Sequence, residues 1–211
     1  MTAGFFSLAL VLTASASGEG GVRHSLVPAG KWDALFEHLQ SVSSFSAQFS
    51  EARYQAFRGT AQRFSGVLRF HADHGVAFHY LQRRERLFLI RDNTLFDATG
   101  GTPENVHLPG DARNLIIAVS RLVQWDQKWI SETFRLSGEY RNTEWRLELD
   151  PVSNDLDDVL MNIVMHGSDT RIQKIIIHQT PNRRVEFSIE DIELHPGWSP
   201  RELDRFFPPH S

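Results

Sequence analysis

The stretch FSGVLRFHADHGVAFHYLQRRERLFLIRDNTLFDA, residues 64–98, decides the fold of this chain. Four short runs of apolar and aromatic residues alternate in it with turn residues, namely Asp73-His74-Gly75, Gln82-Arg83-Arg84 and Asp92-Asn93. Runs of this length between turns predict an antiparallel meander of about four strands, each near the usual five or six residues.

The predicted meander has one apolar face. Side chains of a strand alternate between the two faces of a sheet, so Leu68 and Phe70 share a face of the first strand. Phe78 and Tyr80 likewise share a face of the second strand. Such an aromatic face must be covered, and the rest of the chain supplies candidates to cover it.

Composition excludes several classes of protein. The chain has 211 residues, enough for one large β domain, and 41% of them are hydrophobic, which is ordinary for a globular protein. A formal net charge of -4 argues against nucleic acid as a partner, since phosphate binding needs a basic face. The absence of cysteine excludes disulfides, thiolate zinc sites, a cysteine nucleophile and a lipid-modified cysteine.

The N-terminus predicts export. Residues 4–12 form an uncharged apolar run that is far shorter than the roughly 20 residues of a membrane span. Ala14-Ser15-Ala16 follows and matches the small-x-small cleavage pattern of a secretory signal, although the charged start of such signals is missing. We therefore expect a signal peptide over residues 1–16, a glycine-rich leader over 17–30 and a single domain over 31–211.

Two segments predict amphipathic helices. In residues 32–42, Trp32, Leu35 and Phe36 fall on one arc of a helical wheel together with Leu39. Residues 112–124 show the same pattern after a loop rich in glycine and proline. Each helix would therefore present one apolar stripe to the sheet.

The remaining runs predict strands. They alternate between apolar and polar residues or are rich in β-branched residues, and they cover residues 45–51, 133–137, 145–150, 159–166, 171–178 and 185–190. With the meander this makes about ten strands and two helices, without a βαβ rhythm. An antiparallel sheet of that size curls because strand twist accumulates. The expected fold is mainly β (α+β), an open antiparallel half-barrel with helices covering its concave face.

No pattern in the sequence indicates catalysis or a metal site. The chain has no Gly-x-Ser-x-Gly, Walker or Gly-x-Gly-x-x-Gly motif. It has ten histidines, but His71 and His74 would point to opposite faces of an extended strand, and solvated histidines are the simpler interpretation. Arg83, Arg84 and Arg86 are interpreted as a solvated turn. No cofactor is expected.

The fifteen phenylalanines and five tryptophans leave two interpretations open. They fall largely on inward positions, where a dry, packed core is the first interpretation. The other is a cavity for an apolar ligand, because wide curled sheets can enclose more space than side chains fill. Composition does not separate the two.

The order of elements resembles the LolA-like periplasmic lipoprotein carriers. Residues 45–49, Phe-Ser-Ala-Gln-Phe, look like the opening strand of that family, and residues 66–70 are similar to its Gly-x-Leu strand. Residues 92–96 resemble its Asp-Gly-x-x-Leu-Trp turn, and Leu149-Asp150-Pro151 resembles its Leu-x-Pro strand end. Residues 171–175 and 185–187 look like its last long hairpin, so the resemblance spans nearly the whole mature chain.

The resemblance implies an open barrel, lidded by helices, that shelters the acyl chains of a lipidated cargo. Two departures are visible. Ala72-Asp73 stands where the family has Arg-Pro, and Val76-Ala77-Phe78 stands where it has Phe-Arg-Trp. The arginine linked to cargo release in that family therefore has no counterpart here. The cargo stays open between a lipoprotein, another lipid and a polyene product.

The leading hypothesis is a non-enzymatic periplasmic carrier that ferries acylated cargo toward the outer membrane. Its partners would be the lipoprotein or lipid-like cargo, an inner-membrane transporter and an outer-membrane acceptor, with no nucleic acid, and the protein would be a monomer. The predicted cavity residues are Leu68, Phe70, Phe78, Tyr80, Leu89, Phe96, Leu115, Ile116, Val119, Trp145, Leu147, Ile175, Phe187 and Ile189. The alternatives are a small-molecule enzyme and a sensor or interaction module on the same scaffold.

The helix over residues 112–124 is the expected lid. Its apolar arc includes Leu115, Ile116, Val119 and Val123, which would pack on the mouth of the half-barrel. A lid must open, so we expect its packing to be weaker than that of the sheet core.

Overall fold

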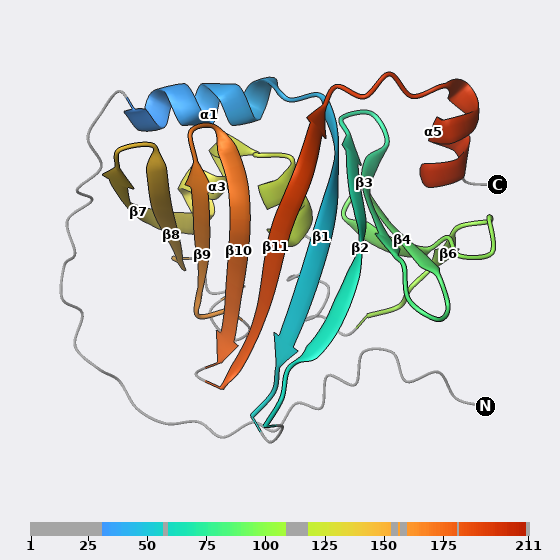
Figure 1. Cartoon of the computed structure of the whole chain (residues 1–211), viewed down its shortest axis with the longest axis horizontal. Coiled ribbons are helices and arrows are strands. Elements are labelled where there is room, and N and C mark those ends of the chain that lie inside the picture. The colour runs from blue at the N-terminus through green and yellow to red at the C-terminus, as the bar shows by residue number, and fades with distance from the viewer. Residues whose placement is uncertain are drawn as a thin grey trace.

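A computed structural model describes residues 31–56, 59–108, 118–152, 156, 160–180 and 182–209. The expected signal peptide and leader, and residues 112–117 of the expected lid, lie outside these described residues. Eleven strands form one antiparallel sheet in the order β6-β5-β4-β3-β2-β1-β11-β10-β9-β8-β7 (Figure 1). The expected mainly β fold with an open sheet is confirmed.

Several strands, among them β1, β7 and β11, are longer than the sequence predicted. Their bounds are β1 Ser44–Tyr54, β2 Gln62–His71, β3 Gly75–Tyr80, β4 Arg86–Arg91, β5 Thr94–Asp97, β6 Glu104–Asn105, β7 Phe134–Arg141, β8 Glu144–Pro151, β9 Asn162–Ser168, β10 Arg171–Thr180 and β11 Arg183–Leu194. The strand expected over residues 159–166 begins later, at Asn162.

The predicted meander is present as β2 to β5. Its strands pair in sequence order, with Leu68 opposite Phe78 and Phe78 opposite Phe88. Asp92 and Asn93 join β4 to β5 with φ angles of 50° and 59°, which is the two-residue turn geometry that matches the right-handed twist of a hairpin. The turn chemistry thus fixes the register that keeps these aromatic side chains on one face.

Three helices with described bounds accompany the sheet. They are α1 Lys31–Ser41, α3 Gln127–Thr133 and α5 Pro200–Phe206, and residues 118–123 are also helical. The helix expected over residues 32–42 is confirmed as α1. Neither α3 nor α5 was predicted from the sequence. None of the described helices is long and apolar enough to span a membrane.

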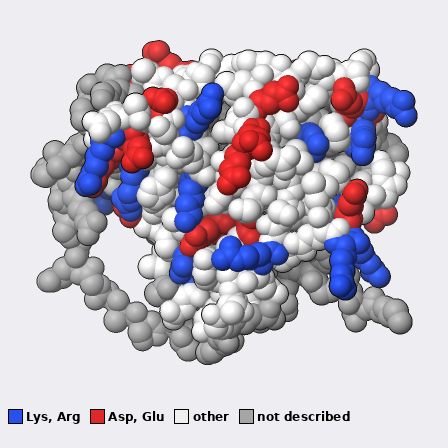
Figure 2. All heavy atoms as spheres, viewed as in Figure 1, with Lys and Arg blue, Asp and Glu red and all other residues white. Residues whose placement is uncertain are grey.

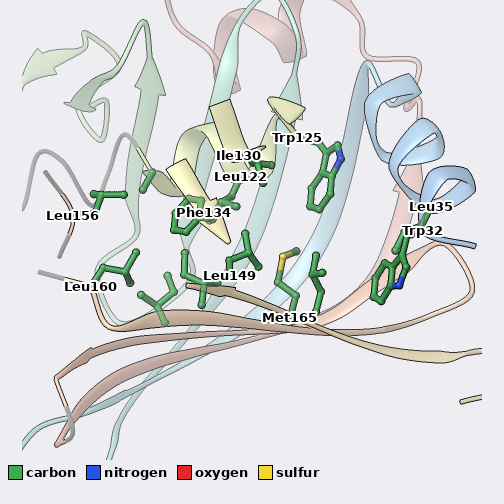
Figure 3. Close-up of a cluster of buried hydrophobic side chains, with 14 of the residues drawn as sticks. Trp32, Leu35, Leu122, Trp125, Ile130, Phe134, Leu149, Leu156, Leu160 and Met165 are labelled. Carbon is green, nitrogen blue, oxygen red and sulfur yellow. The ribbon is translucent and has the colours of Figure 1, made fainter. Parts of the chain in front are cut away.

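One hydrophobic core lies between α1, α3 and the inner face of strands β7 to β10 (Figure 3). Trp32 and Leu35 of α1 are buried against it, at 1% and 2% exposure. The Trp32 ring lies 6.3 Å from that of Trp145 on β8, centroid to centroid. This arrangement explains the apolar arc of α1.

The outer face of the sheet carries many charged side chains, and Figure 2 shows Lys and Arg beside Asp and Glu over it. Glu186 accepts from Lys174 Nζ at 2.9 Å and from Arg184 Nε at 2.8 Å. Arg146 and Glu148 make another pair at 2.9 Å. The two faces therefore differ sharply: the inner face is apolar, while the outer face of β8 to β11 is solvated and charged.

Candidate functional site

The middle of the inner face carries a cluster of three phenylalanine rings from separate strands. Phe49 of β1 lies 5.9 Å from Phe78 of β3 and 6.3 Å from Phe187 of β11, measured between ring centroids. Phe78 and Phe187 lie 6.4 Å apart. These separations are in the range of favourable aromatic pairs. Period-two alternation places all three on the same face, because β1 lies between β2 and β11 in the sheet.

An apolar cavity lies between this cluster and the helical residues 118–123. It is lined by ten residues, all of them apolar: Phe49, Leu68, Phe78, Val119, Leu122, Val123, Ile175, Ile177, Phe187 and Ile189. The helix thus contributes three residues, and the sheet contributes the other seven. No lining side chain offers a nucleophile, an acid or a base.

The free volume of this cavity is small. It measures about 30 Å³, close to the volume that one water molecule occupies in the liquid, whereas ligand pockets usually measure roughly 300–1,000 Å³. In this structure the lining side chains therefore nearly fill the cavity. A chain-like ligand needs more room, which a movement of the helical residues 118–123 away from the sheet would supply.

A buried polar group borders the apolar face. Glu51, on the same face of β1 as Phe49, is 3% exposed. It accepts a hydrogen bond from Tyr80 Oη at 2.7 Å and another from Arg53 Nε. Burial, together with the nearby Glu51 carboxylate, raises the pKa of Tyr80. The hydroxyl thus stays protonated and donates, which satisfies a carboxylate that would otherwise be costly to bury.

Six of the fourteen predicted cavity residues line the observed cavity: Leu68, Phe78, Val119, Ile175, Phe187 and Ile189. Phe70 lies in the adjoining buried cluster, and Tyr80 belongs to the polar border described above. Leu115 and Ile116 lie outside the described residues. A role in lipid binding stays a prediction for all of them.

Two predicted residues lie in the core under α1. Trp145 and Leu147 are on the inner face, as expected, but they are 3% and 0% exposed and belong to the cluster around Trp32. The reason is their strand: β8 is four strands away from β1 in the sheet, where α1 and α3 already cover the inner face. They are packing residues in this structure.

Leu89 and Phe96 were placed on the wrong face. Their neighbours Phe88, Ile90 and Leu95 point inward, so alternation turns Leu89 and Phe96 outward, and the two are directly paired across β4 and β5. Outside, they pack with residues of α5 and its flanks, including Phe207, Trp198 and Leu203.

The C-terminal segment thus covers the outer face of the meander. Arg91 donates to the Phe207 carbonyl at 3.2 Å, and the Arg69 guanidinium lies 3.7 Å from the Phe206 ring centroid. Burial and the nearby Arg205 lower the pKa of Arg69 to about 10.

His71 and His74 lie together, with ring centroids 4.6 Å apart, instead of on opposite faces, because the chain turns between them. Within the described residues no group of three or more histidines and acidic residues could hold a metal ion.

Four lining residues are not among the fourteen predicted cavity residues: Phe49, Leu122, Val123 and Ile177. Of these, Val123 was predicted only as a lid residue at the mouth of the half-barrel. Signals for them were present in the sequence. Ile177 follows Ile175 by two positions, so the two share a face of β10. Leu122 and Val123 lie on the apolar arc of the expected helix, and Phe49 alternates with Phe45 and Ala47 on β1.

Comparison with known proteins gives similarities only at the level of structure. No family model matches the sequence, and no curated protein is significantly similar to it. The LolA superfamily protein NE2245 from Nitrosomonas europaea is 11% identical with a TM-score of 0.43, over 81% of this chain and 96% of that chain.

Two further solved structures are similar to this chain. MucB in the MucA/MucB complex of Pseudomonas aeruginosa is 12% identical with a TM-score of 0.46, over 82% of this chain and 59% of that one. LprF from Mycobacterium bovis is 8% identical with a TM-score of 0.40, over 80% and 93%. LolA-superfamily proteins are thus among the solved structures that this chain resembles. Every TM-score is below 0.5, so function must be argued from the chain's own geometry.

Proposed function

We propose that this chain is a non-enzymatic carrier that shelters the acyl chains of a lipoprotein or another lipid-like cargo between the inner face of its sheet and the helical residues 118–123. The observation that carries the proposal is the cavity at that boundary, whose ten lining residues are all apolar. Acyl chains gain about 25 cal/mol for each Å² of apolar area removed from water, and the site offers them nothing but apolar surface.

The proposal assigns binding, and no bond-making step, to this site. Its lining lacks any group that could transfer a proton or attack a substrate. The proposal includes export to the periplasm, as the Ala14-Ser15-Ala16 pattern predicts. An exported protein whose intact mass begins at Ser17 would support that part, and retention of Met1 would contradict it.

The small free volume of the cavity makes the helical residues 118–123 the gate in this proposal. Val119 packs against both hydrophobic clusters of the inner face, whereas Val123 packs only against the cluster that contains Phe49 and Phe78. Val123 is also only half-buried. It is therefore the residue whose substitution perturbs the cavity boundary with the least damage to the core.

The substitution Val123→Asp tests the proposal. If the helix is a gate, its carboxylate reaches water when the helix lifts, so the melting temperature falls little. The affinity for a fluorescent fatty acid should fall by about tenfold or more, because a tenfold change corresponds to a loss of only about 1.4 kcal/mol in binding free energy. Lys128→Asp, at an exposed position of α3, is the control and should leave both quantities unchanged.

Two outcomes contradict the proposal. A large loss of melting temperature would mean that Val123 belongs to a closed core, where burial of an unpaired carboxylate costs several kcal/mol. Failure of the unmodified protein to bind the fatty acid, with no acyl species found on it by native mass spectrometry, would remove the carrier function. The interaction-module alternative would then stand.

A further inference from the structure

Strands β10 and β11 pair along only part of their length. Ladder pairs join them from Thr180 opposite Arg183 to Lys174 opposite Ser188. Beyond Lys174, β10 continues to Arg171 and β11 continues to Leu194, each paired on its far side with β9 or β1. All of these residues are described, and no ladder pair joins residues 171–173 to 189–192. We call residues 171–174 and 188–192 the seam.

Two bulges account for the seam. The register of β10 against β9 shifts between Ile172 and Lys174. The register of β11 against β1 shifts where Glu190 and Glu193 oppose Gln48 and Ser46, and Asp191 there has a φ of 51°. A bulge bends its strand and increases the local twist. The two strands therefore diverge toward the end of the sheet nearest α1, as Figure 1 shows.

The seam is an open groove of about 710 Å³. Arg171 and Lys174 line it from β10, and Glu190 and Asp191 line it from β11. Apolar contact comes from three isoleucines, Ile172, Ile189 and Ile192. Ile189 also lines the small apolar cavity, so the groove and the cavity adjoin at this residue.

We propose that the seam binds an extended peptide as an added strand, and that this peptide is the segment that follows the acylated residue of a lipoprotein cargo. The inference rests on the proposed carrier function and narrows it. Acyl chains would occupy the cavity beside Ile189, and the attached peptide would leave it along the edges of β10 and β11. The cargo class is then a lipopeptide rather than a free lipid.

The strand edges favour a peptide. Backbone groups of an unpaired strand edge are a template for another extended chain, and peptide recognition by strand addition uses them. Residues 171–173 present such an edge about 10 Å long, at roughly 3.3 Å per residue. The facing edge of residues 189–192 is longer by one residue. A strand of three residues can thus pair with one edge or with both.

The charges of the seam disfavour a lipid head group. An anionic head group is recognised by a cluster of cations, but Glu190 and Asp191 face the cations of β10 here. Lys174 is already paired with Glu186 at 2.9 Å. A backbone strand is uncharged and can carry side chains of either sign, so it suits a groove that has cations on one wall and carboxylates on the other.

Amide hydrogen exchange of the full chain tests the proposal with three probes. They are a cysteine tetrapeptide that carries a diacylglyceryl group with two palmitoyl chains, the same diacylated cysteine as a simple amide, and a dipalmitoyl phospholipid. We expect exchange to slow in residues 171–173 and 189–192 with the lipopeptide alone. We also expect the lipopeptide to bind about tenfold more tightly than the diacylated cysteine amide, as one or two added hydrogen bonds allow.

A tether across the seam supplies a second test. Because the chain has no native cysteine, only the two introduced cysteines react with the cross-linker. The variant Gln173→Cys with Glu190→Cys, joined by a short bismaleimide, should lose the tenfold preference for the lipopeptide and still bind the cysteine amide. The control tether joins Glu144→Cys to Ser168→Cys, which face each other on the paired strands β8 and β9. It should keep the preference.

Each contrary result has a distinct meaning. Binding of both acylated cysteines with equal affinity, without protection in the seam, overturns the peptide site and leaves the carrier function standing. Protection of the seam by the phospholipid shows a head-group site and likewise overturns the peptide site. If none of the three probes binds, the carrier function and the peptide site fall together.

Discussion

Gly138 and Gly167 make room on the inner face for two indole rings. A methyl group at Gly138 would overlap ring atoms of Trp32, and one at Gly167 would overlap ring atoms of Trp145. Trp32 comes from α1 and Trp145 from β8. Both rings fit only because the strand positions that they contact are glycines without a side chain. The glycines are therefore as much a part of the core as the tryptophans.

The substitution Gly138→Val should destabilise the fold by about 1–3 kcal/mol, the usual cost of overpacking. The added carbons displace the Trp32 ring and with it α1. Urea unfolding followed by tryptophan fluorescence measures the loss. Gly100→Val is the matched control, because a Cβ there meets nothing within 4 Å. Equal stability of both variants would show that α1 shifts without cost.

This residue-scale fit could not be predicted from the sequence. From the sequence, a glycine in a strand indicates only a locally weaker strand. Which ring fills the space beside it depends on the placement of α1 and on the register of β8. The inward direction of Trp32 and Trp145, by contrast, followed from simple periodicity. Sequence periodicity identifies the face on which a side chain lies, but not its neighbour on that face.

At the scale of elements, α1 and the longer strands were predictable, whereas α3, α5 and the two-residue β6 were overlooked. Alternation predicted the strand over residues 45–51 and the four strands of the meander. The signature of α5 was also present: Ser199 caps the helix, Pro200 begins it, and the Glu202 carboxylate accepts a hydrogen bond from the Ser199 backbone N–H. Without α5 the predicted fold had no apolar partner for Leu89 outside the sheet, and Leu89 was assigned to the cavity.

α5 is held to the sheet by Phe207, which is 2% exposed and packs on Leu89 and Ala77. We expect Phe207→Ala to cost about 3–5 kcal/mol, as for other buried phenylalanines, and to lower the melting temperature. Binding of a fluorescent fatty acid to the folded variant should persist, since Phe207 lies on the outer face. Arg201→Ala, at an exposed position of α5, should change neither quantity. Lost binding with an intact melting temperature would contradict the separation of the two faces.

At the scale of the whole molecule, the two faces of the sheet differ: the inner face carries apolar side chains, and the outer face of β8 to β11 carries a network of ion pairs. Burial by itself raises the pKa of Glu186, but hydrogen bonds from Arg184 and Lys174 outweigh it and hold that pKa below its ordinary value. The carboxylate therefore stabilises the fold above the unfolded-state pKa, and this contribution is lost as the pH falls through the folded-state pKa.

Replacing this carboxylate shows its contribution. At pH 7, Glu186→Gln should lower the free energy of unfolding by about 1 kcal/mol, since the ion pairs are half-exposed. The difference from the unmodified protein should shrink as the pH falls below the ordinary pKa of 4.5. Urea unfolding at a series of pH values measures it, with the exposed Glu193→Gln as the control. A difference that grows in acid would reverse the assigned sign.

The central position of the β1–β11 pair has a consequence for the order in which the sheet forms. Phe45 pairs with Leu194, so the middle of the sheet joins the first strand of the chain to its last. The two halves of the sheet can form hairpins early, from contacts between near neighbours in sequence. They cannot pair with each other until β11 has been synthesised, because β1 and β11 join them. Pairing across such a sequence separation is slow because loop closure comes first. The sheet therefore becomes whole only after β11 has been synthesised, and until then its two halves lack the strand pair that joins them.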